Sequence, residues 1–260
     1  MGERLAGFPR ELRHRAAVKV WERLLRNLNL EFSEESRQNL LAANQLLKQN
    51  SVVFYINHKS LKKDAALSVS MVLAFLTNAK QIIGPAAMGR YDPSRDLKNA
   101  ILLRALRPLG IQILPIARPE EIDKLDATRY SEEEKKQMRT DLRIATEEAV
   151  RNPGTVFGIA PEGTSKSLDG ALLPARNGIG YLEAFDPDDN LVYLPVAYDY
   201  GISSGHPKIQ VGKPLSLREM NLEKSMLPED SKERAQFLTT VHMKRLADML
   251  PAEMRGVYKS

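Results

Sequence analysis

The residues at positions 57–64, NHKSLKKD, place a histidine and an aspartate directly after the apolar run SVVFYI. A neutral imidazole such as that of His58 accepts a proton from a hydroxyl, and a nearby carboxylate orients the ring and stabilises the imidazolium that forms. This stretch therefore predicts that His58 is a general base and that Asp64 is its partner. Taken alone, the stretch is equally compatible with a purely structural contact between the two side chains.

The spacing of His58 and Asp64 limits how the two side chains can meet. At roughly 100° per residue, six steps along a helix turn by about 240°, so a regular helix would not stack these side chains on one face. The pair must therefore span a loop and the beginning of a helix. Because the entropic cost of closing a loop depends only weakly on its length, we expect Asp64 to reach His58 across this connection.

A second polar stretch, APEGTSKS at positions 160–167, follows the strand-like run TVFGIA. A compact turn after a strand presents backbone donors, and this turn adds hydroxyl groups, a carboxylate and a nearby cation. Such a combination is suited to binding a polyol phosphate. The candidate binding residues are Glu162, Gly163, Thr164 and Lys166. A simple turn without a binding role is the alternative.

The elements that must position these residues are short apolar runs separated by segments with helical periodicity. The expected strands are residues 51–56, 81–83, 111–116, 155–160, 191–197 and 208–211. The expected helices are residues 8–29, 33–49 with Ser33 as N-cap, 65–77, a highly charged segment within 119–151 that exposes i,i+4 ion pairs, and 231–250. This alternation predicts an α/β fold with a largely parallel covered sheet and flanking helices, preceded by an N-terminal helical hairpin. Residues 1–50 are expected to form the hairpin and residues 51–260 the α/β domain.

Positive charge is concentrated near the N-terminus. The chain has a net charge of +5, and residues 1–30 hold seven basic and three acidic groups. Apolar residues recur there at helical spacing, which predicts a basic amphipathic helix on an anionic membrane surface, with Trp21 at the interface. Packing of this helix on the domain, with a solvated basic face, is the alternative.

Composition and motifs disfavour several classes of function. The chain has no cysteine, which removes thiol nucleophiles, thiolate metal sites, iron–sulfur clusters and disulfides. Phosphate-loop motifs are missing, so nucleotide binding has little support. The four histidines are scattered and no HExxH motif occurs, so we expect no metal site. The stretch GISSG at positions 201–205 matches a serine-hydrolase motif, but the following KIQVG is typical of a strand instead of the required helix. A loop between two strands is therefore favoured.

Location and partners follow from what the sequence lacks. No segment has the length and apolarity of a transmembrane helix, and the N-terminus lacks the apolar core of a secretory signal, so we expect a cytoplasmic protein. The basic net charge also suggests nucleic-acid binding. However, the basic groups lack the interleaved aromatic residues of single-strand binders, so no nucleic-acid partner is expected.

Four stretches, taken in their order along the chain, resemble the motifs of the glycerolipid acyltransferase family, the PlsC-like enzymes that include lysophosphatidic acid and glycerol-3-phosphate acyltransferases. They are NHKSLKKD at 57–64, GIQILPIAR at 110–118, PEGTSKS at 161–167 and LPVAYDY at 194–200. The chain departs from the family pattern by placing five residues instead of four between His58 and Asp64, so that Lys63 takes the aspartate register. It also has Ser165 where the family commonly has an arginine.

The resemblance implies an O-acyltransferase of the 1-acylglycerol-3-phosphate type, acting in phospholipid biosynthesis. The donor would be an acyl thioester, either acyl-CoA or acyl carrier protein, and no further cofactor is implied. The acceptor would be the hydroxyl of a glycerol phosphate, and we favour lysophosphatidic acid because an amphiphilic substrate suits a basic interfacial helix. Glycerol-3-phosphate is the alternative acceptor, and a catalytically inactive peripheral membrane-binding module of the same fold is the alternative function. Peripheral association with the membrane is expected in either case.

The resemblance also assigns roles to individual residues. It makes His58 the base on the acceptor hydroxyl and Asp64 its orienting partner, and Ser60 is expected to help shape the site. It places Glu162, Gly163 and Thr164 at the acceptor and Arg118 on the acceptor phosphate, with Lys166 as a substitute for the missing arginine.

Overall fold

The computed structural model describes residues 10–58, 61–87, 110–116, 130–163, 171–201 and 205–259. The strands are β1 (Glu31–Phe32), β2 (Ser51–Ile56), β3 (Gln81–Ala87), β4 (Ile111–Ile116), β5 (Thr155–Ile159), β6 (Leu191–Asp199) and β7 (Lys208–Val211). The α-helices are α1 (Arg10–Asn27), α2 (Glu34–Leu46), α3 (Leu61–Phe75), α6 (Glu132–Arg151) and α7 (Ser231–Asp248). Short 3-10 helices are η3 (Gly180–Phe185), η4 (Arg218–Met220), η5 (Lys224–Met226), η6 (Ala252–Met254) and η7 (Gly256–Tyr258).

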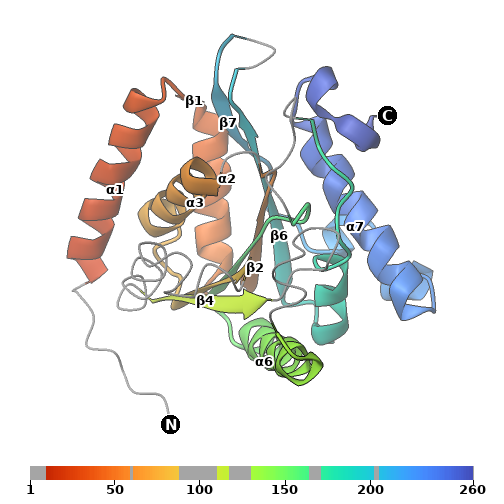
Figure 1. The fold of residues 1–260 in the computed structure, drawn as a ribbon. Helices are drawn as coiled ribbons and strands as arrows, with labels where there is room; N and C mark the ends of the chain where they lie inside the picture. The colour runs from red at the N-terminus through yellow and green to blue at the C-terminus, as the bar shows by residue number, and fades with distance from the viewer. Residues whose placement is uncertain are drawn as a thin grey trace.

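The strands form one seven-stranded sheet in the order β1-β7-β6-β2-β5-β3-β4. All neighbouring strands are parallel except β6 and β7, which are antiparallel. Helices flank this sheet on both sides (Figure 1). The predicted α/β class with a largely parallel, covered sheet is therefore confirmed.

The predicted elements agree with the structure except at some boundaries. The expected strands at 51–56, 111–116 and 208–211 have the predicted bounds, and the other three differ at one end. Helix α3 begins at Leu61, four residues before its expected start, and so has Asp64 in its first turn. Strand β1 was not expected, because two residues are too short to show an alternating pattern.

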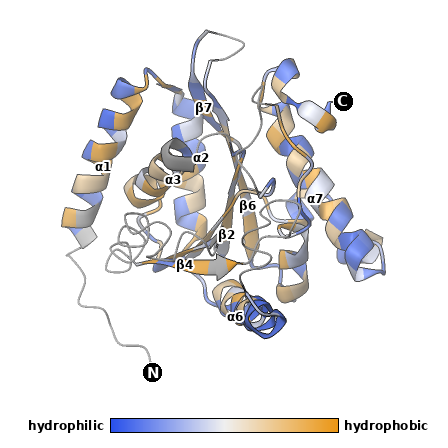
Figure 2. Cartoon of the chain, viewed as in Figure 1, coloured by the Kyte–Doolittle hydropathy of each residue, from blue (hydrophilic) through white to orange (hydrophobic). Residues whose placement is uncertain are grey.

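Alternate side chains of β2 enter two separate hydrophobic cores, as its pleat requires. Val52 and Phe54 pack with residues of α1, α2 and α3, whereas Val53 and Tyr55 pack with residues of α6, η3 and α7. All six residues of β2 are buried, which is typical of a central strand covered on both faces. Helix α6 buries Met138, Ala149 and Val150, whereas its N-terminal end, EEEKKQ, is hydrophilic in Figure 2. The sheet is thus the middle of three layers.

The two N-terminal helices are joined through β1, which pairs in parallel with β7 at the edge of the sheet. Helix α1 lies along α3. Trp21 on α1 is only 2% exposed and meets the rings of Phe32 and Phe75 edge-on, with centroids 5.2 Å and 6.0 Å away. The expectation that Trp21 lies at a membrane interface is therefore wrong, because its ring anchors α1 to the core. The large apolar side chains that α1 exposes are instead Leu12 and Val20.

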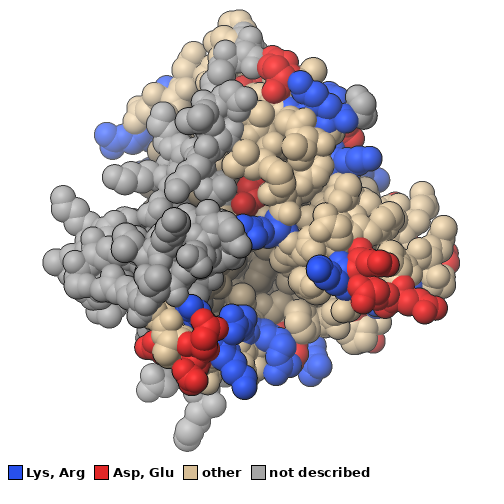
Figure 3. All heavy atoms as spheres, turned by 45° about the vertical axis from the view of Figure 1, so that its right-hand side comes forward, with Lys and Arg blue, Asp and Glu red and all other residues tan. Residues whose placement is uncertain are grey.

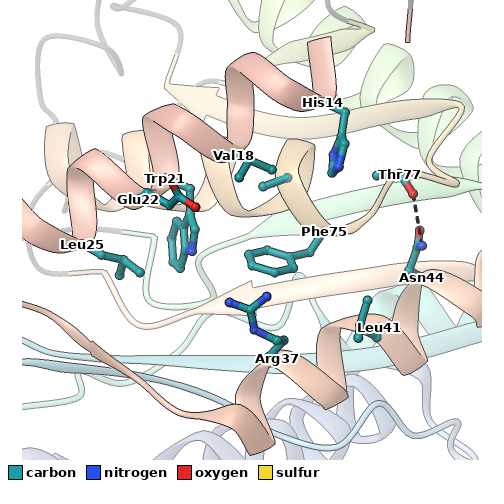
Figure 4. A pocket seen from close by; sticks show the side chains of 11 residues that line it. His14, Val18, Trp21, Glu22, Leu25, Arg37, Leu41, Asn44, Phe75 and Thr77 are labelled. Atoms are coloured by element: carbon teal, nitrogen blue, oxygen red, sulfur yellow. Dashed lines mark hydrogen bonds between the residues drawn. The ribbon is translucent and has the colours of Figure 1, made fainter. Parts of the chain in front are cut away.

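A groove lies between α1, α2 and the C-terminal end of α3 (Figure 4), with a cavity volume of about 380 Å³. Trp21, Leu41 and Phe75 line it, and the guanidinium of Arg37 lies 5.6 Å from the centroid of the Phe75 ring. At a rise of roughly 1.5 Å per residue, the last turn of α3 lies about 15 Å from the first turn, which contains Asp64. The groove is therefore separate from the part of α3 that contains Asp64.

The starts of two helices are capped as their sequences indicate. The Ser36 backbone N–H donates to Ser33 Oγ over 3.1 Å, which confirms Ser33 as the N-cap of α2. Helix α6 begins with a reciprocal capping box between Ser131 and Glu134. The predicted i,i+4 ion pairs of this charged helix include the one between Arg143 and Glu147, at 2.7 Å.

A buried histidine on α7 gives the fold a predictable sensitivity to acid. His242 is fully buried, stacks on the Tyr193 ring at 4.1 Å and meets Tyr55 edge-on. Burial, assisted by the positive charge of Arg245, lowers the pKa of His242 from 6.5 to about 3. The unfolded chain binds a proton at this residue below its ordinary pKa, whereas the folded chain does so only near pH 3. The free energy of unfolding is therefore expected to fall as the pH drops from about 6.5 toward 3.

Chemical denaturation at pH 7, 5 and 4 measures this dependence. Replacing His242 by phenylalanine keeps an aromatic ring against Tyr193 and should flatten the decline, whereas His206→Gln, at an exposed position, should leave it unchanged. An equally steep decline in the His242→Phe variant would contradict the prediction.

Candidate functional site

The candidate site lies where three neighbouring strands end. Strands β6, β2 and β5 are adjacent and parallel, so their carboxyl ends share one edge of the sheet. His58 follows β2, Glu162 and Gly163 follow β5, and Tyr200 follows β6. The chain leaves β2 into α3 on one face of the sheet and leaves β5 toward η3 on the other face. Such a divergence of the connections after two neighbouring strands is the usual place for a binding site in an open α/β sheet.

His58 and Asp64 form the contact that the sequence predicts. His58 Nδ1 lies 2.7 Å from Asp64 Oδ2, and the side chains are 11% and 0% exposed, respectively. The carboxylate accepts the Nδ1–H of the ring, which selects the tautomer with its lone pair on Nε2. The five intervening residues therefore do not prevent the pairing, because α3 begins early enough to carry Asp64 in its first turn. The side chain of Lys63 lies outside the described residues.

Tyr200 binds the other oxygen of the same carboxylate. Its hydroxyl donates to Asp64 Oδ1 from the end of β6. Burial, followed by the negative charge of Asp64, raises the pKa of Tyr200 well above its ordinary value, so the phenol stays protonated and remains a donor. Tyr200 belongs to the stretch LPVAYDY, but its contact with Asp64 could not be predicted from the sequence, since Tyr200 and Asp64 are 136 positions apart.

Asn57 ties the ends of β2 and β6 together. Its Nδ2 donates to the Tyr198 carbonyl over 3.0 Å, and its Oδ1 accepts the Tyr198 backbone N–H at 2.7 Å. The β2–β6 ladder pairs residues as far as Ile56 and Val196, so the Asn57 side chain continues the pairing beyond the last strand residue. This gives the asparagine that precedes His58 a structural role.

Glu162 supports the backbone of His58. Its Oε1 accepts the His58 backbone N–H over 3.0 Å, and its Oε2 accepts the Leu173 backbone N–H over 2.9 Å. Burial raises the pKa of the Glu162 carboxyl, and these two N–H groups partly offset that effect by favouring the carboxylate. Both carboxylate oxygens of Glu162 therefore accept backbone N–H groups, one of which is that of His58. A direct role at an acceptor stays a prediction.

Gly163 and Arg176 shape the turn after β5. Gly163 has φ of +66°, a conformation that glycine adopts without strain, and its N–H donates to the Ala160 carbonyl over 3.0 Å. The Arg176 backbone N–H donates to the Pro161 carbonyl, and the stem of the Arg176 side chain lies beside Gly163. Arg176 is exposed at this turn. Arg176 was not among the predicted site residues, because no motif connects it to the turn after β5.

Four of the predicted site residues cannot be placed. Ser60, Arg118, Thr164 and Lys166 lie outside the described residues. Strand β4, which leads toward Arg118, is separated from β5 by β3. The contribution of these four side chains therefore remains a prediction.

The GISSG stretch joins two antiparallel strands. Asp199 at the end of β6 pairs with Lys208 at the start of β7, so the chain after the stretch is a strand, as expected. Residues 202–204 lie outside the description. From Gly205 to Val211 the described chain contains no helix but leads into β7, so the arrangement differs from a nucleophile elbow and the serine-hydrolase alternative loses its support.

The geometry as a whole suits a histidine general base. A buried carboxylate fixes one nitrogen of the ring, and two strand ends fix that carboxylate and the backbone of the histidine. Among the described residues, no group of three or more potential ligands is placed to hold a metal ion. No protein-family model and no curated protein matches the chain. The assignment of a reaction therefore depends on the motifs and on this geometry.

Proposed function

We propose that this chain is an acyltransferase that moves a fatty acyl group from a thioester to the hydroxyl of a glycerol-phosphate acceptor. The observation that carries the proposal is the contact between His58 and Asp64, which holds Nδ1 of the ring and leaves Nε2 basic at the carboxyl edge of the sheet. Many reactions use such a base. The order of the four motifs along the chain selects acyl transfer among them.

The proposed reaction proceeds without a covalent acyl-enzyme. His58 Nε2 takes the proton of the acceptor hydroxyl as the oxygen attacks the thioester carbonyl carbon. The tetrahedral intermediate collapses by breaking its carbon–sulfur bond, and the departing thiolate takes the proton back from the imidazolium. An ester and a free thiol result. While His58 holds the proton, its ring is a positively charged imidazolium. The negative charge of the Asp64 carboxylate stabilises this imidazolium.

The acceptor proposal is lysophosphatidic acid, with acyl-CoA or acyl carrier protein as donor. A phosphate at the site needs cations, and Arg176 beside the turn at Gly163 is one that the structure describes. Arg118 and Lys166 are proposed to contribute to the same phosphate. A single acyl chain on the acceptor is consistent with a protein that collects its substrate from a membrane surface.

A panel of acceptors with detection of the released thiol tests the proposal directly. The protein has no cysteine, so a thiol reagent reports only the donor's leaving group. We expect thiol release from an acyl thioester that depends on lysophosphatidic acid and exceeds the release with glycerol-3-phosphate or with water. If no acceptor stimulates release while the protein still binds vesicles, the chain is an inactive membrane-binding module.

Membrane association is proposed to use the outer side of α1. In the part of the chain that the structure covers, none of the helices combines the length and the apolarity needed to cross a bilayer. Arg15, Lys19 and Arg23 are exposed and follow one another at i,i+4 spacing, so they form a basic stripe on α1. Leu12 and Val20 are exposed beside this stripe. Basic groups next to apolar side chains suit an anionic interface.

Charge on another face of the molecule and on α6 is mixed. On the face shown in Figure 3, basic and acidic side chains lie close together around a shallow hollow. Helix α6 has the same mixture, because three glutamates open it and several lysines and arginines follow. A mixed surface has no strong preference for an anionic membrane, so α6 provides a matched control for α1.

Neutralising the basic stripe is expected to weaken vesicle binding. Each basic group near an anionic surface contributes about 1 kcal/mol, so changing Arg15, Lys19 and Arg23 to glutamine should reduce affinity for phosphatidylserine-containing vesicles by more than tenfold. The control variant changes three exposed residues of α6 to glutamine, which alters the net charge equally: Lys136, Arg139 and Arg143. Co-sedimentation measures both variants. Equal losses would show that only net charge matters, and no loss in the α1 variant would rule out this surface.

A further inference from the structure

We infer that Tyr200 is a positioning residue that fixes the Asp64 carboxylate in the orientation that pairs with His58. The inference rests on the proposed function for its effect on rate, but its geometric content concerns only three side chains. Tyr200 directly follows β6, whereas the pair that it supports lies after the end of β2 and at the start of α3.

Two hydrogen bonds on different oxygens hold the carboxylate. Asp64 Oδ1 accepts the Tyr200 hydroxyl, and Asp64 Oδ2 accepts His58 Nδ1–H at 2.7 Å. A carboxylate held at one oxygen alone can still turn about its Cβ–Cγ bond. A donor at each oxygen prevents that rotation. The orientation of the carboxylate then sets the orientation of the His58 ring that binds to it. Asp64 is completely buried, so water cannot replace the donor cheaply.

The position of Tyr200 is itself well determined. Asn57 makes two hydrogen bonds with the backbone of Tyr198, two residues before Tyr200. The backbone just before Tyr200 is thus held against the end of β2, and this contact does not involve the Tyr198 hydroxyl. From this backbone the Tyr200 hydroxyl reaches Asp64.

The Tyr200 contact does not depend on the chain that joins His58 to Asp64. Five residues separate these two side chains in the sequence, and α3 begins among them, at Leu61. Tyr200 restrains the carboxylate from a part of the chain 136 positions away.

The test compares Tyr200, which directly follows β6, with Tyr198, which lies in β6. Tyr200→Phe removes the hydroxyl that donates to Asp64, and Tyr198→Phe removes a buried hydroxyl that bonds to Ser68. We expect Tyr200→Phe to lower kcat by about tenfold or more without a comparable change in the acceptor KM, because misplacing a catalytic pair affects the reacting geometry more than binding. The rate of Tyr198→Phe should stay close to that of the unmodified protein. Thermal unfolding of both variants shows whether their stabilities are similar.

Nitrogen-15 NMR of His58 gives a readout that a general structural role would not produce and that needs no activity. The unmodified protein should show the Nδ1–H tautomer of the neutral ring. In Tyr200→Phe, the Nε2–H tautomer should become populated, whereas Tyr198→Phe should keep the Nδ1–H form. A Tyr200→Phe variant with an unchanged tautomer and unchanged kcat would overturn the inference.

The same spectra separate failure of this inference from failure of the proposed function. If no acceptor is acylated but the tautomer shifts in Tyr200→Phe, the positioning role stands and the acyltransferase proposal falls. A second measurement applies even if the variant does not fold. The Tyr200 hydroxyl proton of the unmodified protein should exchange slowly with water, and exchange at the rate of an exposed phenol would contradict the contact.

Discussion

Replacing His58 by alanine is expected to lower the acyl-transfer rate by about 10²–10⁴, the usual loss when a general base is removed. The side chain lies at the end of β2 and is not part of either hydrophobic core, so the fold should persist. Thiol release with saturating acceptor measures the rate, and circular dichroism with thermal unfolding verifies the fold. The exposed His206→Ala is the matched control and should retain full activity.

Chemical rescue sharpens this experiment. Added imidazole can occupy the space left by the ring and act as the base, so it should restore part of the lost rate in His58→Ala and have little effect on the unmodified protein. A folded His58→Ala variant that retains more than half of the activity would end the proposed mechanism. Loss of activity without any rescue would count as loss of the general base only if the variant still binds the acceptor.

Replacing Asp64 by asparagine is expected to have the second largest effect, on the order of a 10³-fold loss of rate. The side chain keeps its size, so the packing around it should change little. An amide, however, cannot stabilise the imidazolium that forms when His58 takes the acceptor proton. Asparagine also has an NH₂ group in place of one carboxylate oxygen. It can therefore no longer accept hydrogen bonds from both His58 and Tyr200. The exposed Asp141→Asn on α6 controls for the loss of one negative charge.

Lys63 provides the comparison that tests the unusual spacing. The resemblance to the acyltransferase pattern puts Lys63 in the position of the aspartate, whereas the structure pairs Asp64 with His58. We therefore expect Lys63→Ala to cost far less rate than Asp64→Asn. A fully active Asp64→Asn would refute the orienting role. An inactive unmodified protein that becomes active on deletion of Lys63 would show that the extra residue disrupts the enzyme.

The sequence by itself determined the class of fold and the identity of the central pair. After Ser51 the run VVFYI contains no charged residue and is rich in β-branched and aromatic side chains, which is typical of a strand covered on both faces, so β2 and the parallel sheet are predicted from composition and length. His58 and Asp64 are close in the chain, so their contact depends on local geometry that the spacing constrains. Local segments of this kind are predictable because few conformations join a strand to the helix that follows it.

The remainder of the site depends on the order of strands in the sheet. Tyr200 and Glu162 are 136 and 104 residues from their partners, and no local pattern indicates that their strands end beside β2. The same is true of Trp21, where helical spacing shows that α1 has an apolar face but leaves open whether that face meets a membrane or α3. Periodicity records that a face is buried. Only the packed structure decides what buries it, because any apolar surface satisfies the hydrophobic effect, which has no directional preference.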